Sequence, residues 1–367
     1  MPGDCAPNPV ASPYDHLTVY YFSGTGNALT ASRWIRENAA KKGMTTDLLS
    51  IDRFQKVSVP AAGGKKLIGF CYPTHGFNLP WIMLKFIARF PARERCDVFL
   101  LNTRAGSKIC KWFAPGVSGI AQILPALILR VKGFRIRSLF PLDMPSNWVS
   151  VHPGFKPATV VAIAARCRVM TDGFCEKVLA GRMHFRPNVF FMMPIDIALA
   201  PIAFLYFIYG RFFFAKLFFA SSDCDGCGLC ADKCPTASIH MVDRRPFWKF
   251  TCESCMRCMN LCPRRAIQVS HLLAALIAVA GSLLPLALLY KAIDPHLPSA
   301  LRGPVNFIVN WGIAMSLYFL ASGAAFWLMR TRCINRLFTY TSLTKYWRRY
   351  LASGIRARDF GKGRSRR

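Results

Sequence analysis

The sequence predicts an α/β domain with a doubly wound, five-stranded parallel sheet, then a small cysteine-rich α+β domain, and finally a transmembrane helical hairpin. Three observations lead to this prediction. Apolar strands alternate with helical stretches over residues 17–180, two identical cysteine arrays lie between 224 and 263, and two uncharged apolar runs follow. A chain of 367 residues has room for such a succession of domains. We expect the boundaries 1–185, 186–220, 221–270, 271–330 and 331–367.

The composition points to a membrane surface and away from nucleic acid. Lys and Arg number 48 against 18 Asp and Glu, a net charge of +30, and 53% of residues are hydrophobic. A basic, apolar chain suits the cytoplasmic face of an anionic membrane, and the chain shows no nucleic-acid-reading motif. The N-terminus has neither the basic nor the apolar region of a signal peptide, so we expect the chain to face the reducing cytoplasm.

The first domain is predicted from its alternating pattern. Strands are expected at 17–22, 45–50, 66–72, 97–102 and 134–141, with helices from Asn27 and at 79–91, 117–131 and 157–180. Such alternation predicts a doubly wound sheet, and ligands bind such sheets at the carboxyl ends of the strands. Three loops are expected at that edge: Ser23–Asn27, Tyr72–Pro80 and Asn102–Gly106.

The first of these loops, "FSGTGN", joins a strand to a helix. Backbone N–H groups and a helix N-terminus there are directed at an anion, and Ser23 and Thr25 add hydroxyl groups. The loop by itself is a weak signal, and an ordinary tight turn is the alternative. No G-x-G-x-x-G follows a strand, so no nicotinamide site is expected.

The two cysteine arrays both read C-x2-C-x2-C-x3-C-P. This spacing is typical of paired [4Fe–4S] clusters, in which the fourth cysteine of each array completes the other cluster. One cluster would then take Cys224, Cys227, Cys230 and Cys262, and the other Cys252, Cys255, Cys258 and Cys234. Zinc is the alternative, but it usually takes two C-x2-C pairs rather than this tandem arrangement.

The arrays resemble the bacterial two-cluster ferredoxins, and the first domain resembles flavodoxin. The order "YFSGTGN", the loop "YPTHGFNLP", "FLLNTRAG" and "MPSNW" resembles more closely the flavodoxin–ferredoxin fusions of the EFR1 family, over residues 17–270 with an interruption. The resemblance implies FMN, with its phosphate on the loop and its ring between the two later loops. Its implied binding residues are Ser23, Gly24, Thr25, Gly26, Asn27, Tyr72, His75, Phe77, Asn78, Thr103, Arg104 and Gly106.

Two of these residues have open roles. His75 could stack on or protonate the flavin, or be a surface-loop histidine without chemistry. Arg104 could stabilise an anionic flavin, or be a solvated charge. Ala28 stands where flavodoxin loops usually carry a hydroxyl, so one phosphate contact is missing.

The membrane hairpin is predicted from residues 271–290 and 306–329, runs of 20 and 24 residues without Asp, Glu, Lys or Arg. About 20 apolar residues cross a bilayer core. The tail from Arg330 carries twelve Lys and Arg, which by the positive-inside rule places both ends of the hairpin in the cytoplasm. Buried core helices are the alternative.

A third apolar stretch, 189–210, would place the two cofactor domains on opposite sides if it crossed once. It contains Asp196, Pro194 and Pro201, which are costly in mid-membrane. We expect residues 186–220 to be re-entrant or interfacial, with Arg211 and Lys216 reaching lipid headgroups; a buried inter-domain helix is the alternative.

The tail is predicted as an interfacial helix over 337–351 followed by a disordered Gly- and Arg-rich end. Taken together, the sequence predicts an electron-transfer protein at the inner membrane, with redox domains facing the cytoplasm. It would relay single electrons between FMN and two [4Fe–4S] clusters, from a donor protein to a membrane-bound acceptor enzyme. The alternatives are a flavin-dependent reductase of a quinone or lipid, and a redox-sensing scaffold.

Overall fold

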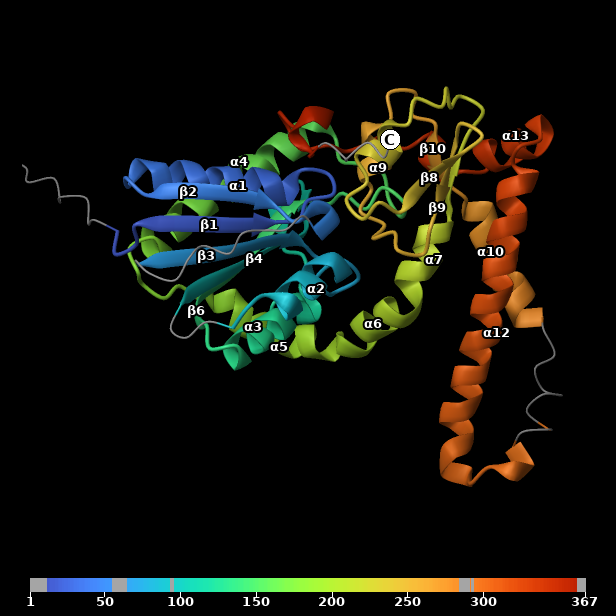
Figure 1. Cartoon of the computed structure of the whole chain (residues 1–367), viewed down its shortest axis with the longest axis horizontal. Coiled ribbons are helices and arrows are strands. Elements are labelled where there is room, and N and C mark those ends of the chain that lie inside the picture. The colour runs from blue at the N-terminus through green and yellow to red at the C-terminus, as the bar shows by residue number, and fades with distance from the viewer. Residues whose placement is uncertain (1–11, 55–64, 93–95, 284–290, 292–293, 362–367) are drawn as a thin grey trace, which may run out of the picture.

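The computed structural model describes residues 12–54, 65–92, 96–283, 291 and 294–361. Three parts are seen in Figure 1: an α/β domain, a small domain beside it, and a helical hairpin that projects away from both. The N-terminal residues 1–11, residues 284–290 of the first predicted membrane run, and residues 362–367 of the tail lie outside the described residues.

The α/β domain contains five parallel strands in the order β2-β1-β3-β4-β6, as predicted. This is the flavodoxin-like doubly wound order, whose ligand site lies at the carboxyl ends of the strands. The strands are β1 (His16–Tyr21), β2 (Thr45–Ser50), β3 (Lys66–Pro73), β4 (Asp97–Ile109) and β6 (Arg135–Pro145), and β5 (Trp112–Ala114) pairs antiparallel with the end of β4.

Helices cover both faces of the sheet because strand residues alternate between the two faces. Val19 of β1 packs with helices α1 and α4, whereas Tyr20 packs with α2 and α3. These helices are α1 (Asn27–Lys41), α2 (Trp81–Arg89), α3 (Ile123–Val131) and α4 (Pro157–Val178). Short 3₁₀ turns lie at η1 (Asp52–Phe54) and η2 (Gly119–Ala121).

One expectation about the sheet was wrong. Residues Asn102–Gly106 do not form a loop, because β4 continues through them and stays paired with β6 as far as Gly106 and Pro145. Thr103, Arg104 and Gly106 are therefore strand residues.

The connecting segment consists of α5 (Pro187–Ala198), α6 (Ala200–Leu205), a π-helical turn η3 (Tyr206–Gly210) and α7 (Arg211–Lys216). It runs along the underside of the α/β domain and then rises to the small domain (Figure 1). Asp196 is buried and accepts hydrogen bonds from the backbone N–H groups of Ser118 (3.1 Å) and Gly119 (2.7 Å). The carboxylate that is costly in lipid thus lies against protein.

Arg211 and Lys216 were expected to reach lipid headgroups, but neither side chain extends away from the protein. The Arg211 guanidinium lies 4.7 Å from the ring centre of Trp81, and Lys216 donates a hydrogen bond of 2.6 Å to the carbonyl of Trp248. Neighbouring elements of the fold therefore hold both cations. The aromatic face of Trp81 attracts Arg211, and the carbonyl of Trp248 accepts from Lys216.

The small domain contains an inner pair of antiparallel strands, β7 (Phe218–Ala220) and β10 (Ile267–Val269), and a hairpin of β8 (Ile239–Val242) and β9 (Arg245–Trp248). Two short helices follow the cysteine loops, α8 (Leu229–Asp232) and α9 (Arg257–Leu261). The domain begins slightly before the expected residue 221, because β7 supplies one of its strands.

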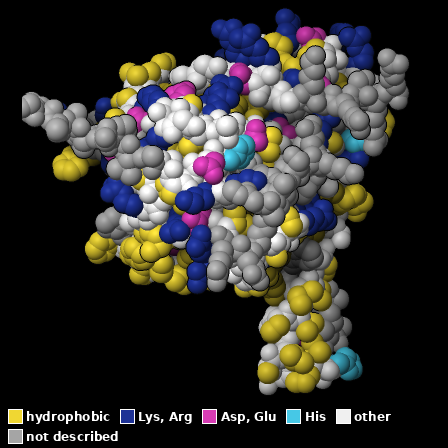
Figure 2. Space-filling view, turned by 60° about the vertical axis from the view of Figure 1, so that its left-hand side comes forward, with side chains coloured by type: hydrophobic (Ala, Val, Ile, Leu, Met, Phe, Trp, Pro, Cys, Tyr) yellow, Lys and Arg dark blue, Asp and Glu magenta, His cyan; other side chains and the backbone are white. Residues whose placement is uncertain are grey.

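The projecting helices are α10 (His271–Leu283) and α12 (Ser299–Leu328), joined through η4 (Asp294–His296). Apolar side chains cover the protruding lower part of the molecule in Figure 2. Within the described residues, no single helix meets the length and hydropathy of a membrane span. The segments Val189–Ala198 and Ala200–Lys216 are bent by 60° relative to each other, and only the two together reach the length and hydropathy of a span. The transmembrane hairpin stays a prediction.

The tail forms α13 (Arg332–Tyr340), η5 (Leu343–Lys345) and η6 (Ala357–Asp359), and it returns to the junction between the two domains. The predicted helix over 337–351 therefore ends earlier, and its contact with lipid stays a prediction. The expected disorder was wrong for the described residues 354–361, because Phe360 is packed there and only 2% exposed. Before it, the Thr344 hydroxyl accepts a hydrogen bond of 3.0 Å from the N–H of Val269, which ties the tail to the small domain.

Candidate redox centres

The two cysteine loops have the same backbone conformation. Gly226 and Gly228 have φ of +75° in the first loop, and the matching residues of the second loop, Ser254 and Met256, have φ of +48° and +61°. A non-glycine residue adopts this conformation only at a cost in energy, so the surrounding contacts must hold the second loop in place.

The crossed assignment of the fourth cysteines stays a prediction, and the electrostatic interactions among the thiols are consistent with it. Electrostatic repulsion from Cys262 adds to burial in raising the pKa of Cys224 and of Cys230, the latter to about 12. Burial is the main cause that raises the pKa of the first three cysteines of the second array, and electrostatic repulsion from Cys234 adds to it. These cysteines are Cys252, Cys255 and Cys258. The thiols of the two arrays thus interact with one another, and Cys230 of the first array also acts on Cys258 of the second.

Backbone N–H groups point at the sulfur atoms. The N–H of Ser238 lies 3.2 Å from Cys234 Sγ, and the N–H of Ala266 lies 3.3 Å from Cys262 Sγ, each four residues beyond its cysteine. Such donors stabilise thiolates and so fit cluster ligands. Among the described residues, no three His, Cys, Asp or Glu side chains gather as ligands of a single ion.

A cavity of about 650 Å³ lies where the carboxyl edge of the sheet meets the second cysteine loop. Five of the residues predicted to bind flavin line it: Gly24, Asn27, His75, Thr103 and Arg104. Its other lining includes residues that were not predicted to bind flavin: Ser146, Asn147, Trp148, Tyr206, Ser254, Cys255 (predicted only as a cluster ligand) and Met256. The first three belong to "MPSNW", whereas the others come from distant segments.

The loop Ser23–Asn27, which was predicted to hold a phosphate, lies at one end of this cavity, and the tail covers its outer side. Gly24 packs on the second cysteine loop, because a Cβ atom there would lie 2.1 Å from the carbonyl oxygen of Cys255. The carbonyl of Thr25 accepts a hydrogen bond of 2.9 Å from the N–H of Ala352, and the side chain of Asn27 accepts one of 2.6 Å from Tyr350. Ser23, Thr25 and Gly26 shape the loop without lining the cavity.

The remaining predicted flavin residues lie outside the cavity. Tyr72 is buried and donates its hydroxyl to the carbonyl of Ala121 (2.9 Å), and Phe77 and Asn78 form the turn below it. Gly106 packs on the backbone of Asp143. These residues support the site only through the fold.

Arg104 and His75 are neither solvated charges nor simple surface residues. Arg104 is 4% exposed and bonds Asp143 through its Nε at 2.6 Å. Burial lowers the pKa of His75 to about 4, so its ring is neutral at physiological pH. His75 Nδ1 and Ser254 Oγ are buried and have no hydrogen-bond partner in the described part of the chain. The cavity therefore offers unpaired polar atoms to a ligand, which fits a bound flavin.

Buried ionic contacts fix the second cysteine loop on the α/β domain. Arg257 is 2% exposed and bonds both carboxylate oxygens of Asp52 (2.6 and 3.2 Å) and the carbonyl of Ser23 (2.6 Å). Glu253 accepts hydrogen bonds from the N–H groups of Trp81 (3.1 Å) and Ile82 (2.8 Å), and burial raises its pKa to about 7. These contacts hold the second array against the cavity.

Comparison with known proteins identifies the first cysteine array. A family model described as a 4Fe–4S binding domain matches residues 219–240. No curated protein matches the chain. Three similar solved structures each align with less than half of this chain.

The first is a flavodoxin from the domain Archaea, at 18% identity, covering 44% of this chain and 96% of its own, with a TM-score of 0.26. The second is a flavone reductase, at 10% identity, covering 47% and 65%, with a TM-score of 0.31. The third is a mutant flavo di-iron protein from Thermotoga maritima, at 14% identity, covering 45% and 37%, with a TM-score of 0.26. The assignment of the sheet therefore depends on its own strand order. The chain joins a doubly wound sheet of flavodoxin-like topology to a 4Fe–4S binding domain.

Proposed function

We propose that this protein is an electron-transfer protein of the inner membrane, which relays electrons between FMN and two [4Fe–4S] clusters. Its redox domains would face the cytoplasm and serve a membrane-bound acceptor enzyme, supplied by a separate donor protein. The observation that carries this proposal is the shared cavity, whose walls come from the flavodoxin-like sheet and from Ser254–Met256 of the second cysteine loop.

The α/β domain and the second cysteine loop each supply part of the proposed flavin site. Gly24 and Asn27 would hold the phosphate end of FMN, and Thr103, His75 and Ser254 would border its ring. A flavin exchanges electrons in pairs or singly, and iron–sulfur clusters exchange them singly. Because Cys255 lines the cavity, the second cluster would be the one nearer the flavin.

The second cluster is proposed from the repeat of the cysteine array. Cys234 lies in the segment matched as a 4Fe–4S binding domain, and it acts electrostatically on the thiols of the second array. In this proposal a cluster in the matched segment would take Cys262 as its fourth ligand, and Cys234 would serve a second cluster.

The proposed membrane arrangement follows from the domain contacts and the exposed apolar side chains. Arg257 and Asp52 join the two redox domains directly, so the connecting segment 186–217 would return to the side on which it began. The helices α10 and α12 expose Leu276, Phe307, Ile308, Phe319 and Leu320. In water such a surface would be costly, whereas in lipid it would be favourable.

The test is titration of FMN into flavin-free, cluster-loaded protein, followed by quenching of the flavin fluorescence. We expect one FMN per chain, with affinity lowered about three- to tenfold by Thr103→Val and by Ser254→Ala, the loss of one hydrogen bond. Thr18→Val is the control, because Thr18 is also buried but lies inside β1, away from the cavity. No binding, or equal affinity in all three variants, would contradict the proposal.

A further inference from the structure

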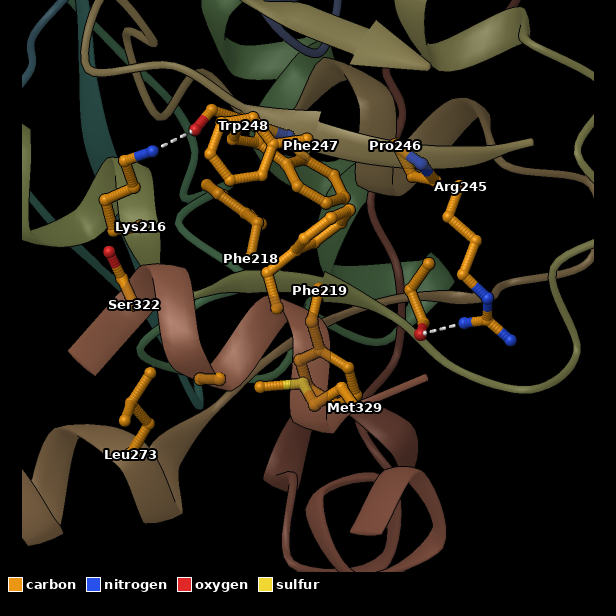
Figure 3. A pocket seen from close by; sticks show the side chains of 13 residues that line it. Lys216, Phe218, Phe219, Arg245, Pro246, Phe247, Trp248, Leu273, Ser322 and Met329 are labelled. Carbon is orange, nitrogen blue, oxygen red and sulfur yellow. Dashed lines mark hydrogen bonds between the residues drawn. The ribbon is translucent and has the colours of Figure 1, made fainter. Parts of the chain in front are cut away.

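A second cavity lies between the 4Fe–4S domain and the projecting helices. Its empty space is about 490 Å³ when the open solvent at its mouth is included. Phe218, Phe247 and Trp248 form the wall on the domain side (Figure 3). Ala325 and Met329 of α12 form part of the opposite wall.

The polar groups of this cavity are mainly hydrogen-bond donors. Lys216 and Arg245 lie on opposite sides of the aromatic wall in Figure 3. Lys216 Nζ lies 4.1 Å from the ring centre of Phe247, and Arg245 donates a hydrogen bond of 2.9 Å to the carbonyl of Ala220. Trp248 is 3% exposed, and its Nε1 has no hydrogen-bond partner among the described residues. A fitting ligand is thus apolar, carries acceptor oxygens and has no positive charge.

The cavity lies beside both sets of cysteines. Phe218 and Trp248 of its wall belong to one packed apolar cluster, which also contains Cys234 of the second predicted set. Cys252 of the second set, and Cys230 and Cys262 of the first, pack against the same cluster. A molecule held between Lys216 and Arg245 would be close to both predicted clusters, on the side that faces α10 and α12.

We propose that this cavity binds a lipophilic quinone, which enters along the apolar helices and is reduced there. A quinone has a flat apolar ring with carbonyl oxygens at opposite ends, and so matches aromatic walls with donors on both sides. A fatty acid has its acceptors at one end only, so it would meet the donors on one side of the cavity and not those on the other. The inference rests on the proposed function in one respect, because the reduced clusters supply the electrons.

The reaction balances without another reagent. Two reduced clusters give one electron each, solvent gives two protons, and one quinone becomes one quinol while both clusters are oxidised. The chain's own contribution is to hold the ring between Lys216 and Arg245 and to exclude water with its aromatic wall.

The first test measures binding in the oxidised full-length protein, where no electron donor is needed. Decyl-ubiquinone that co-elutes with the protein in detergent is extracted and measured by its absorbance. We expect saturable binding of one quinone per chain. Ala325→Trp fills the cavity and should weaken binding at least about tenfold, whereas the matched variant Ala324→Trp, at an exposed position of the same helix, should bind as the wild type does.

Lys216→Met provides a second variant that leaves the shape of the cavity almost unchanged. It should weaken binding of the quinone about three- to tenfold, as expected for the loss of one charged donor. Equal binding by the Ala325→Trp and Ala324→Trp proteins would overturn the proposal. Saturable binding of oleate without any binding of decyl-ubiquinone would also overturn it, by identifying a fatty acid site.

The second test follows electron transfer. Clusters reduced with dithionite and freed of excess reductant should regain their visible absorbance on addition of decyl-ubiquinone, more slowly in Ala325→Trp than in Ala324→Trp. If the wild-type protein contains FMN and both clusters but binds no quinone, only the quinone site is refuted. If it binds quinone but contains no clusters or no FMN, only the proposed relay is refuted.

Discussion

The buried ion pair between Arg257 and Asp52 should carry much of the stability of the domain junction. Their side chains are 2% and 10% exposed, and Arg257 Nη1 and Nη2 bond the two carboxylate oxygens at 2.6 and 3.2 Å. Arg257→Met would leave the Asp52 carboxylate buried without its cation. Removing one partner of a buried pair costs about 3–5 kcal/mol, and we expect this loss in the free energy of unfolding.

The assay is anaerobic urea unfolding of the holoprotein, followed by cluster absorbance and far-ultraviolet circular dichroism. Asp52→Leu should restore part of the loss in the Arg257→Met background, because neither charge is then buried alone. Arg33→Met is the control, since Arg33 is 32% exposed in its 2.6 Å pair with Asp359 and such pairs contribute at most about 1 kcal/mol. A cost for Arg257→Met no larger than for Arg33→Met would refute the reasoning.

Three further predictions concern the clusters, the loop contact and pH. Cys234→Ala should lower the iron content from about eight to about four per chain and leave the same paramagnetic resonance spectrum as Cys258→Ala, because both ligate one cluster; different residual spectra would contradict the crossed pairing. Gly24→Ala should lower the free energy of unfolding in urea titrations, since its Cβ would lie 2.1 Å from a backbone oxygen, whereas Gly173→Ala, with open space in a helix, should raise it by about 0.5–1 kcal/mol. Burial lowers the pKa of His75 from 6.5 to about 4, so the unfolded chain binds the proton first. The stabilisation that depends on neutral His75 should therefore be fully present above pH 6.5 and should decrease as the pH drops to about 4. His75→Gln should reduce this dependence of the free energy of unfolding on pH in urea titrations. An unchanged pH dependence would show that His75 does not cause it.

The repeating patterns of the sequence predicted the architecture well. Alternation of strands and helices gave the sheet and its edge, because burial of apolar residues on the two faces is a local periodic signal. The cysteine spacing predicted the 4Fe–4S binding domain, which the family match over residues 219–240 confirms, because the spacing of ligands within one loop is also a local signal.

Contacts between distant segments could not be read from local pattern. The tail has the composition of a disordered segment, yet Phe360 packs under Arg257, with 4.2 Å between the guanidinium and the ring centre. The shared cavity was missed for a related reason, because Ser254 and Met256 reach it only after the domains dock. The extension of β4 past Asn102 depends on a partner strand more than thirty residues away.

The central claim is that one chain carries two [4Fe–4S] clusters and a flavin at their junction. The most direct measurement is the quantity of iron, acid-labile sulfide and extracted flavin per chain, in full-length protein purified in detergent without oxygen. The account predicts about eight irons, about eight sulfides and one FMN. Eight irons without flavin, even after incubation with FMN, would contradict it and leave the α/β domain as a docking module for the clusters.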